Sequence, residues 1–175
     1  RGLEGVGTGR RRRWIGDRPG DVPVRFARAG ALAERDVLDG ARAAYVHAAR
    51  SSPRLLRAHL GAALTLPMIP ASQASIREAR AAFAAGLERL RDELPAAATT
   101  MPQAQVLREL CWTNFLLAYQ GEDDLALQSA YGDLVATTLA ASRGPAIAAV
   151  PAPRTAPGRR RVAFVSAFFR EGTVG

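Results

Sequence analysis

The sequence predicts a mainly α-helical protein of tetratricopeptide-like helical hairpins and connector helices, with one β-strand near its C-terminal end. Two observations lead to this fold class. Apolar residues recur every three to four positions in successive segments up to about residue 142, without a strand-like pattern between them. A proline-rich stretch and then a run of β-branched and aromatic residues follow. At 175 residues and 48% hydrophobic, the chain is long enough for one ordinary core.

The first two helices are predicted over residues 22–34 and 37–50. Gly30 weakens the first, because glycine inside a helix costs about 1 kcal/mol relative to alanine. Asp36 is expected to cap the second helix, and Pro53 follows its end. The apolar stripe of the second helix comprises Val37, Ala41, Ala44, Tyr45 and Ala48.

A third helix is predicted over residues 53–64, before two prolines that cannot continue it, Pro67 and Pro70. Its apolar face comprises Leu56, Leu60, Ala63 and Leu64. These three helices, within residues 22–66, have partial tetratricopeptide spacing. The matching positions of the second and third helices are Ala41, Tyr45, Ala48, Pro53, Leu60, Gly61 and Leu64. An ordinary amphipathic hairpin in an alanine-rich chain also satisfies some of these spacings, and Tyr45 is expected to pack rather than to contact a ligand.

The helix with the clearest start signal follows in a connector region predicted over residues 67–142. Ser75 and Glu78 have the spacing of a capping box, with Ser72 as a competing cap, and Pro95 is expected to end the helix. Its apolar stripe comprises Ile76, Ala79, Phe83, Leu87, Leu90 and Leu94. This stripe predicts one face buried against the rest of the domain.

Two more helices are predicted in the connector. The first ends at Gly121 and carries Val106, Leu107, Leu110, Cys111, Leu117 and Ala118. Asn114 lies on the same face, where a structural amide that bridges helices is expected. Asp123 opens the second, which carries Leu127, Ala130, Tyr131, Leu134 and Thr138.

The net charge of +8 is concentrated at the two ends of the chain. Residues 26–142 hold 11 arginines against 12 acids, whereas the irregular segment 1–21 contains four consecutive arginines. Residues 143–161 hold five arginines and no acid, and most of this stretch forms a Pro/Arg-rich linker predicted over 143–160. No aromatic residues interleave the arginines of that stretch, so nucleic acid is not an expected partner. An RNA-binding protein would instead show steeply salt-dependent binding.

Location and metal binding can be addressed from composition. No apolar run reaches the roughly 18 residues of a membrane span, and the N-terminal segment has arginines without the apolar stretch of a secretory signal, so no membrane partner and a cytoplasmic location are expected. Cys111 is the single cysteine and is expected to be a free, buried thiol. His47 and His59 lie in separate helices without a catalytic neighbour in the sequence, so surface or packing roles are expected, and no metal site is predicted.

Three segments together resemble bacterial members of the protein O-linked N-acetylglucosamine transferase family. They are "ALTLPMIPASQASIREARAAFAAGLERL" at 63–90, "CWTNFLLAYQGEDDLALQSAYGDL" at 111–134 and "RVAFVSAFFREGTVG" at 161–175. The last is similar to the first strand and loop of that family's N-terminal Rossmann-like half. The resemblance covers roughly residues 36–175, and its order, with the proline linker between, also agrees.

The resemblance implies a larger protein in which repeats bind a protein partner or acceptor, followed by two Rossmann-like lobes around a nucleotide sugar. The family transfers N-acetylglucosamine from UDP-GlcNAc to serine or threonine hydroxyls, without a covalent enzyme intermediate and generally without a metal. No cofactor is expected in this chain. Residues 161–175 supply only one strand and loop, so we expect a truncated catalytic region and an inactive fragment. The competing hypothesis is a non-enzymatic scaffold that binds proteins on its helical surface.

The tentative site residues lie in the loop after the strand: Glu171, Gly172 and Thr173. Gly172 occupies the position where the family commonly has a histidine, which puts the usual mechanism in doubt. Glu171 has the chemistry of an acid or base, although an ordinary exposed loop glutamate is the favoured interpretation. The Gly172 and Gly175 spacing is a weak phosphate-loop signal that turn formation also explains.

Overall fold

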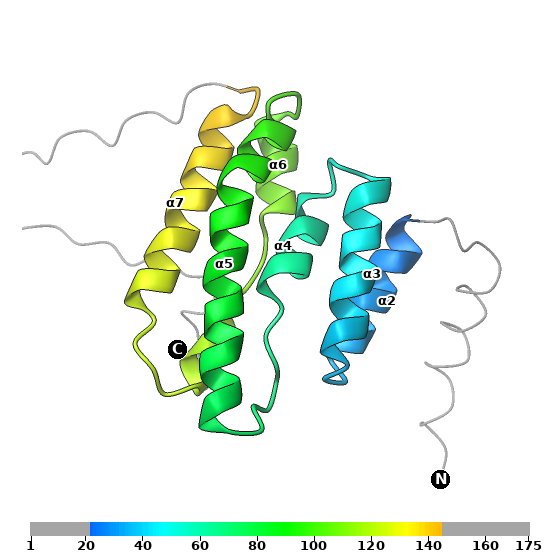
Figure 1. Cartoon of the computed structure of the whole chain (residues 1–175). Helices are drawn as coiled ribbons and strands as arrows, with labels where there is room; N and C mark the ends of the chain where they lie inside the picture. Colours follow the sequence, from blue (N-terminus) through cyan, green and yellow to red (C-terminus); the bar gives the residue numbers. More distant parts are fainter. Residues whose placement is uncertain (1–21, 145–175) are drawn as a thin grey trace, which may run out of the picture.

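A computed structural model describes residues 22–144, and within them the chain is helical as the sequence predicts (Figure 1). The elements are α2 (Val22–Ala33), α3 (Leu38–Ser51), α4 (Leu56–Leu64), α5 (Gln73–Ala98), α6 (Gln103–Glu109), the 3₁₀ helix η1 (Phe115–Tyr119) and α7 (Leu125–Ala141). Among the described residues, β pairing is limited to one isolated bridge between Pro102 and Arg143. The strand predicted after residue 161 and the candidate residues Glu171, Gly172 and Thr173 lie outside the described range.

The helices run back and forth, so several connections gather at one end of the domain (Figure 1, lower edge). This end, which we call the loop end, contains the α2–α3 turn, the connection from α4 to α5, η1 and the start of α7. Neighbours along the chain pack in pairs, α2 on α3, α3 on α4 and α4 on α5, and α5 also packs on α7. None of the described helices is long and apolar enough to cross a membrane.

The α3–α4 contact depends on a glycine. A Cβ atom added at Gly61 would lie 2.7 Å from the ring of Tyr45, so α4 approaches α3 closely only because this side chain is absent. Phe26 and Trp112 meet the same tyrosine ring edge-on, at centroid distances of 5.4 and 6.1 Å. The packing role expected for Tyr45 is confirmed, whereas the tetratricopeptide assignment stays a prediction.

Helix α5 begins and ends differently from the sequence expectation. Ser72 is the cap: its hydroxyl accepts from the Ser75 amide and the Ser75 hydroxyl accepts from the Ser72 amide, so Glu78 is not part of the box. The prediction that Pro95 ends the helix is wrong, since the helix continues to Ala98. Leu94 and Ala98 are both fully buried, and their packing outweighs the one backbone hydrogen bond that a proline removes.

The prediction of a single helix from Val106 to Ala118 is also wrong. It divides into α6, an extended stretch and η1, because the chain leaves helical geometry after Leu110 and carries Trp112 to Tyr45. This division leaves three residues of the expected apolar stripe exposed, Leu107, Cys111 and Ala118. The thiol is therefore accessible, contrary to the prediction of a buried one.

The two aspartates predicted at helix starts have different outcomes. Asp36 does not cap α3, whose N-cap is Val37 without a side-chain hydrogen bond. Asp123 lies one residue before the N-cap of α7, Asp124, and its Oδ1 accepts from the Leu125 amide at 2.9 Å. The start of α7 is thus stabilised by the residue that the sequence indicated, whereas Asp36 has another role at the loop end.

Candidate functional site

A hollow of about 310 Å³ opens at the loop end, and we call it the loop-end groove. Three segments line it: residues 33–34 from the end of α2, residues 64–66 and 68 after α4, and residues 112–116 before and within η1. Most of these side chains are apolar, including Leu66, Met68, Trp112 and Phe115. The groove therefore combines parts of the chain from residue 33 to residue 116.

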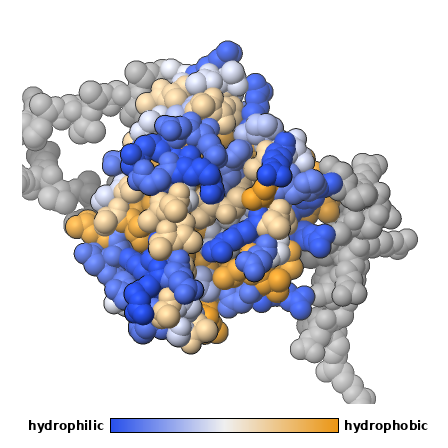
Figure 2. Space-filling model, in the orientation of Figure 1, coloured by the Kyte–Doolittle hydropathy of each residue, from blue (hydrophilic) through white to orange (hydrophobic). Residues whose placement is uncertain are grey.

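Exposed large apolar residues are concentrated in the segments of the loop end, and two of them, Met68 and Phe115, line this groove. Ile69 is 78% exposed and Phe115 is 62% exposed, and the Phe115 and Tyr119 rings meet edge-on at 5.0 Å. Most of the large hydrophobic residues exposed within the described range belong to loop-end segments, namely Val37, Met68, Ile69, Phe115, Tyr119 and Leu125. Figure 2 shows hydrophobic patches that are separated by hydrophilic side chains on the viewed face. A concentration of exposed apolar residues in neighbouring loop-end segments favours an interaction site, whereas single apolar side chains on a surface are ordinary.

The connection after α4 is held in place by two charged side chains. Asp36 accepts from the Met68 amide at 2.7 Å and from the Ile69 amide at 3.3 Å. On its other side, Arg42 donates to the Thr65 carbonyl at 2.9 Å. Asp36 itself has a φ of +56°, a conformation that asparagine and aspartate adopt more readily than most residues. The exposed Met68 and Ile69 are thus presented on backbone that is hydrogen-bonded to the α2–α3 turn.

Replacing Asp36 with alanine is expected to release this connection. Two amides lose a charged acceptor, so the domain should lose about 1–2 kcal/mol of unfolding free energy. Amide hydrogen exchange should accelerate at Met68 and Ile69. Asp39→Ala, which removes a neighbouring exposed carboxylate, is the matched control and should leave those two amides unchanged. Equal amide exchange rates at Met68 and Ile69 in wild type and Asp36→Ala would refute the role of Asp36 in holding this connection.

The loop end is acidic, and Glu34 places one of its carboxylates on the groove lining. Residues 34–39 and 120–124 together contain six carboxylates and one arginine, Arg35. Asp124 pairs with Arg80, and Asp36 and Asp123 accept backbone amides. The other three, Glu34, Asp39 and Glu122, make no ion pair with any residue from 22 to 144. An apolar hollow with such a carboxylate on its lining suits a ligand that has both apolar groups and a cation.

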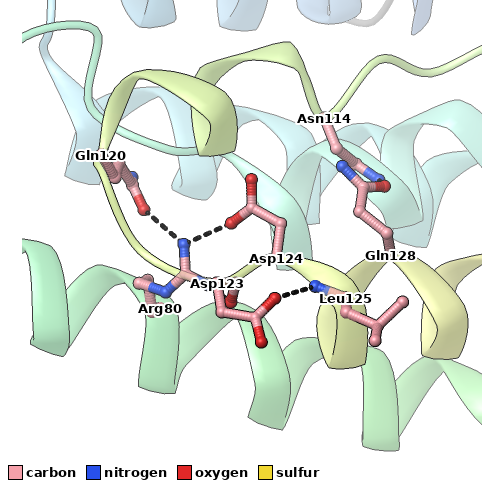
Figure 3. A network of polar contacts seen from close by, with 7 residues as sticks. All are labelled: Arg80, Asn114, Gln120, Asp123, Asp124, Leu125 and Gln128. Atoms are coloured by element: carbon pink, nitrogen blue, oxygen red, sulfur yellow. Dashed lines mark hydrogen bonds and ion pairs between the residues drawn. The ribbon is translucent and has the colours of Figure 1, made fainter.

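Arg80 fixes the second of these acidic stretches, residues 120–124 (Figure 3). From α5 its guanidinium donates to Asp124 Oδ1 at 2.7 Å and to Gln120 Oε1 at 3.3 Å, and also to the Asp123 carbonyl. The Arg80 and Asp124 side chains are only 14% and 22% exposed, so this pair is largely removed from water. It ties the η1–α7 connection to α5.

Several buried polar side-chain atoms of segment 112–120 lack a hydrogen-bond partner among the described residues. Asn114 bridges to α7, as expected of a structural amide, with Nδ2 3.5 Å from Gln128 Oε1 (Figure 3). Its Oδ1, however, is buried without a hydrogen-bond partner among those residues, as are Trp112 Nε1 and Gln120 Nε2. Buried polar groups in folded proteins are usually paired. Three such atoms in nine residues indicate that this segment is not optimised for the packing of the described domain alone.

Tyr45, beneath the groove, has a pKa raised above the usual 10.0, first by burial and then by the nearby Glu34 carboxylate. The fold therefore favours the neutral phenol, and this contribution to stability is complete below pH 10.0 and is lost as the pH rises through the folded-state pKa. We expect urea unfolding to show a loss of stability above pH 10.0 that is smaller in Tyr45→Phe. In Tyr119→Phe, which removes an exposed hydroxyl, the alkaline loss should remain. Identical pH profiles in wild type and Tyr45→Phe would contradict this assignment.

The histidines behave as the sequence suggests. His47 is exposed, and His59 Nδ1 lies 3.8 Å from Glu93 Oε2 without a nucleophile beside it. No group of acidic, histidine or cysteine side chains with the arrangement of a metal site occurs between residues 22 and 144. The residues that form the groove, chiefly Glu34, Met68, Trp112 and Phe115, were not singled out from the sequence. The aromatic spacing in "WTNFLLAY" at 112–119 is a signal that could have indicated Trp112 and Phe115, whereas Glu34 and Met68 had none.

Comparison with known proteins leaves the family open. No protein-family model matches the chain, and no curated protein or solved structure matches it either.

Proposed function

We propose that residues 22–144 form a protein-binding module whose ligand site is the loop-end groove. The observation that carries this proposal is the coincidence of exposed apolar side chains with backbone held by Asp36 and Arg42. A held apolar surface loses little conformational entropy when a partner covers it, which favours binding. A partner protein in the cytoplasm, where we place the chain, is the expected ligand.

The chemistry of the groove favours one kind of ligand segment. Trp112 and Phe115 offer aromatic faces, and the Glu34 carboxylate on the lining has no ion-pair partner among the described residues. An extended segment with apolar anchors and a flanking arginine or lysine meets both features. Aromatic grooves of this type commonly bind extended peptides, and the Glu34 charge adds specificity.

We further propose that this module belongs to a glycosyltransferase that uses UDP-GlcNAc and modifies serine or threonine hydroxyls of proteins. The support is the resemblance of segments 63–90, 111–134 and 161–175 to the O-linked N-acetylglucosamine transferase family, and a groove for acceptor proteins fits such an enzyme. Gly172 stands where the family commonly has a histidine, which puts the family's usual mechanism in doubt for such an enzyme. Considered without the family resemblance, the groove favours the alternative, a scaffold without catalysis.

Calorimetric titration of the 175-residue chain with UDP-GlcNAc separates binding from catalysis. One predicted strand cannot form a cleft between two lobes, so we expect no heat of binding. Measurable binding would overturn the expectation that this chain is inactive by itself.

Selection from a random peptide display library tests the groove. We expect enriched peptides that carry a cation beside apolar residues, retained by wild type but not by Phe115→Asp. Leu107→Asp is the matched control, since Leu107 is 55% exposed on α6, away from the groove lining. Retention of the same peptides by Phe115→Asp, or no enrichment on wild type, would refute the proposed site.

A further inference from the structure

We propose that the chain carries its own ligand for the loop-end groove: the segment Pro151–Pro157, "PAPRTAP", which would occupy the groove within the same molecule and compete with partner proteins. This inference rests on the groove being the binding surface proposed above. It adds a regulatory property, because a partner must then displace a tethered segment.

The length of chain available supports this assignment. The described chain leaves α7 beside Pro102, where the Arg143 amide donates to the Met101 carbonyl and the Gln103 amide donates to the Arg143 carbonyl. This exit lies at the end of α7 opposite the loop end (Figure 1). The 17 residues of α7 span about 25 Å. An extended polyproline conformation covers about 22 Å from Gly144 to Pro151 and about 40 Å to Pro157. Pro151, at about 22 Å, falls short of the about 25 Å of α7, so it is the C-terminal part of the segment, toward Pro157, that can run back along α7 and reach the loop end.

The chemistry of the segment matches the groove. Three prolines in seven residues favour an extended backbone and offer flat apolar rings to the aromatic side chains of the groove. Arg154 lies between them, and residues 143–161 contain no acid, whereas Glu34 on the groove lining makes no ion pair with any residue from 22 to 144. Other segments are less suited. The run 162–169 has no charge to meet the carboxylate of the groove. The arginines at 10–13 have no proline among or next to them, since the first proline of the chain is Pro19.

Tethering makes this contact effective without high intrinsic affinity. A short flexible connection raises the effective concentration of the segment at the groove to about the millimolar range. A groove contact too weak to be seen between separate molecules would therefore still be largely formed within one chain.

The single exposed cysteine provides a direct test. Cys111 precedes Trp112 of the groove lining, so a nitroxide attached to it in the full chain broadens amide signals of any segment nearby. We expect the NMR signals of Ala152, Arg154, Thr155 and Ala156 to be lost with the oxidised label and restored when it is reduced. Broadening of residues 10–15 or 162–169 in their place, or of none of these, would overturn the proposal.

Two controls identify the contact as groove-dependent and intramolecular. Phe115→Asp should restore the signals of residues 152–156, whereas Leu107→Asp should leave them broadened. In an equal mixture of spin-labelled chain and isotope-labelled chain without a nitroxide, these signals should stay sharp. Broadening in the mixture would make a second copy the occupant and refute the proposal. Enrichment of peptides in the selection without broadening of residues 152–156 would refute the tethered segment but not the groove, so the failure of this inference can be recognised separately from that of the proposed function.

Discussion

Replacing Gly86 with alanine is expected to destabilise the domain by about 2 kcal/mol, although alanine is the better helix former. A Cβ atom at this position would lie 2.6 Å from the carbonyl oxygen of Ala63 and 3.1 Å from its carbonyl carbon. Both contacts are with the backbone of α4, which has no rotamer to change, so the two helices must move apart. Phe83, Leu87 and Leu90 of α5 lie in the core beside α4 and would lose packing contacts with it. The free energy of unfolding in urea measures this loss.

Gly132→Ala is the matched control for that substitution. Gly132 lies within α7, and a Cβ atom there meets nothing within 4 Å. Alanine should therefore stabilise the domain by up to about 1 kcal/mol, the difference in helix propensity. If both substitutions stabilise the protein equally, the close crossing of α4 and α5 is wrong.

Removing the Arg80 side chain is expected to cost about 3 kcal/mol, the lower end of the range for breaking a buried ion pair. Arg80→Ala leaves the Asp124 carboxylate, Gln120 Oε1 and the Asp123 carbonyl without their guanidinium donor. Urea unfolding of Arg80→Ala, Asp124→Ala and the double variant measures the coupling between the charged side chains. We expect the double variant to lose clearly less than the sum of the single losses.

Arg91→Ala is the control for this cycle. Arg91 donates to Glu88 at 2.9 Å on the same face of α5, but both side chains are mostly exposed. Exposed pairs of this kind contribute about 0–1 kcal/mol. Similar losses in Arg80→Ala and Arg91→Ala would mean that the η1–α7 connection is not fixed in the way Figure 3 shows.

The helices of the described domain could be predicted because long apolar stripes leave few alternatives. Five of the six stripe residues predicted for α5, from Ile76 to Leu94, are buried, and the starts of α4 and α7 fall within a few residues of those expected. Local rules failed where packing outweighed them. Pro95 remains helical because Leu94 and Ala98 are buried on either side of it, and the stripe at Val106–Ala118 did not reveal the break after Leu110.

The groove could not be predicted in the same way, because its parts come together only in the folded chain. Asp36 had the chemistry of a helix cap, yet it binds amides 32 and 33 positions later. Phe115 was not among the stripe residues expected from the sequence, and in the 3₁₀ helix its side chain is exposed. Conversely, the candidates Glu171, Gly172 and Thr173 depend on the family resemblance and stay predictions.

The central claim is that the loop-end groove binds proteins, and the dissociation constant of one selected peptide tests it most directly. The constant is measured by calorimetry for wild type, Phe115→Asp, Glu34→Arg and Leu107→Asp. We predict that Phe115→Asp raises it by about tenfold or more, as expected for an anchor residue of an interface. Glu34→Arg should raise it less and mainly at low salt, and Leu107→Asp should leave it unchanged. Equal constants for Phe115→Asp and wild type would contradict the account.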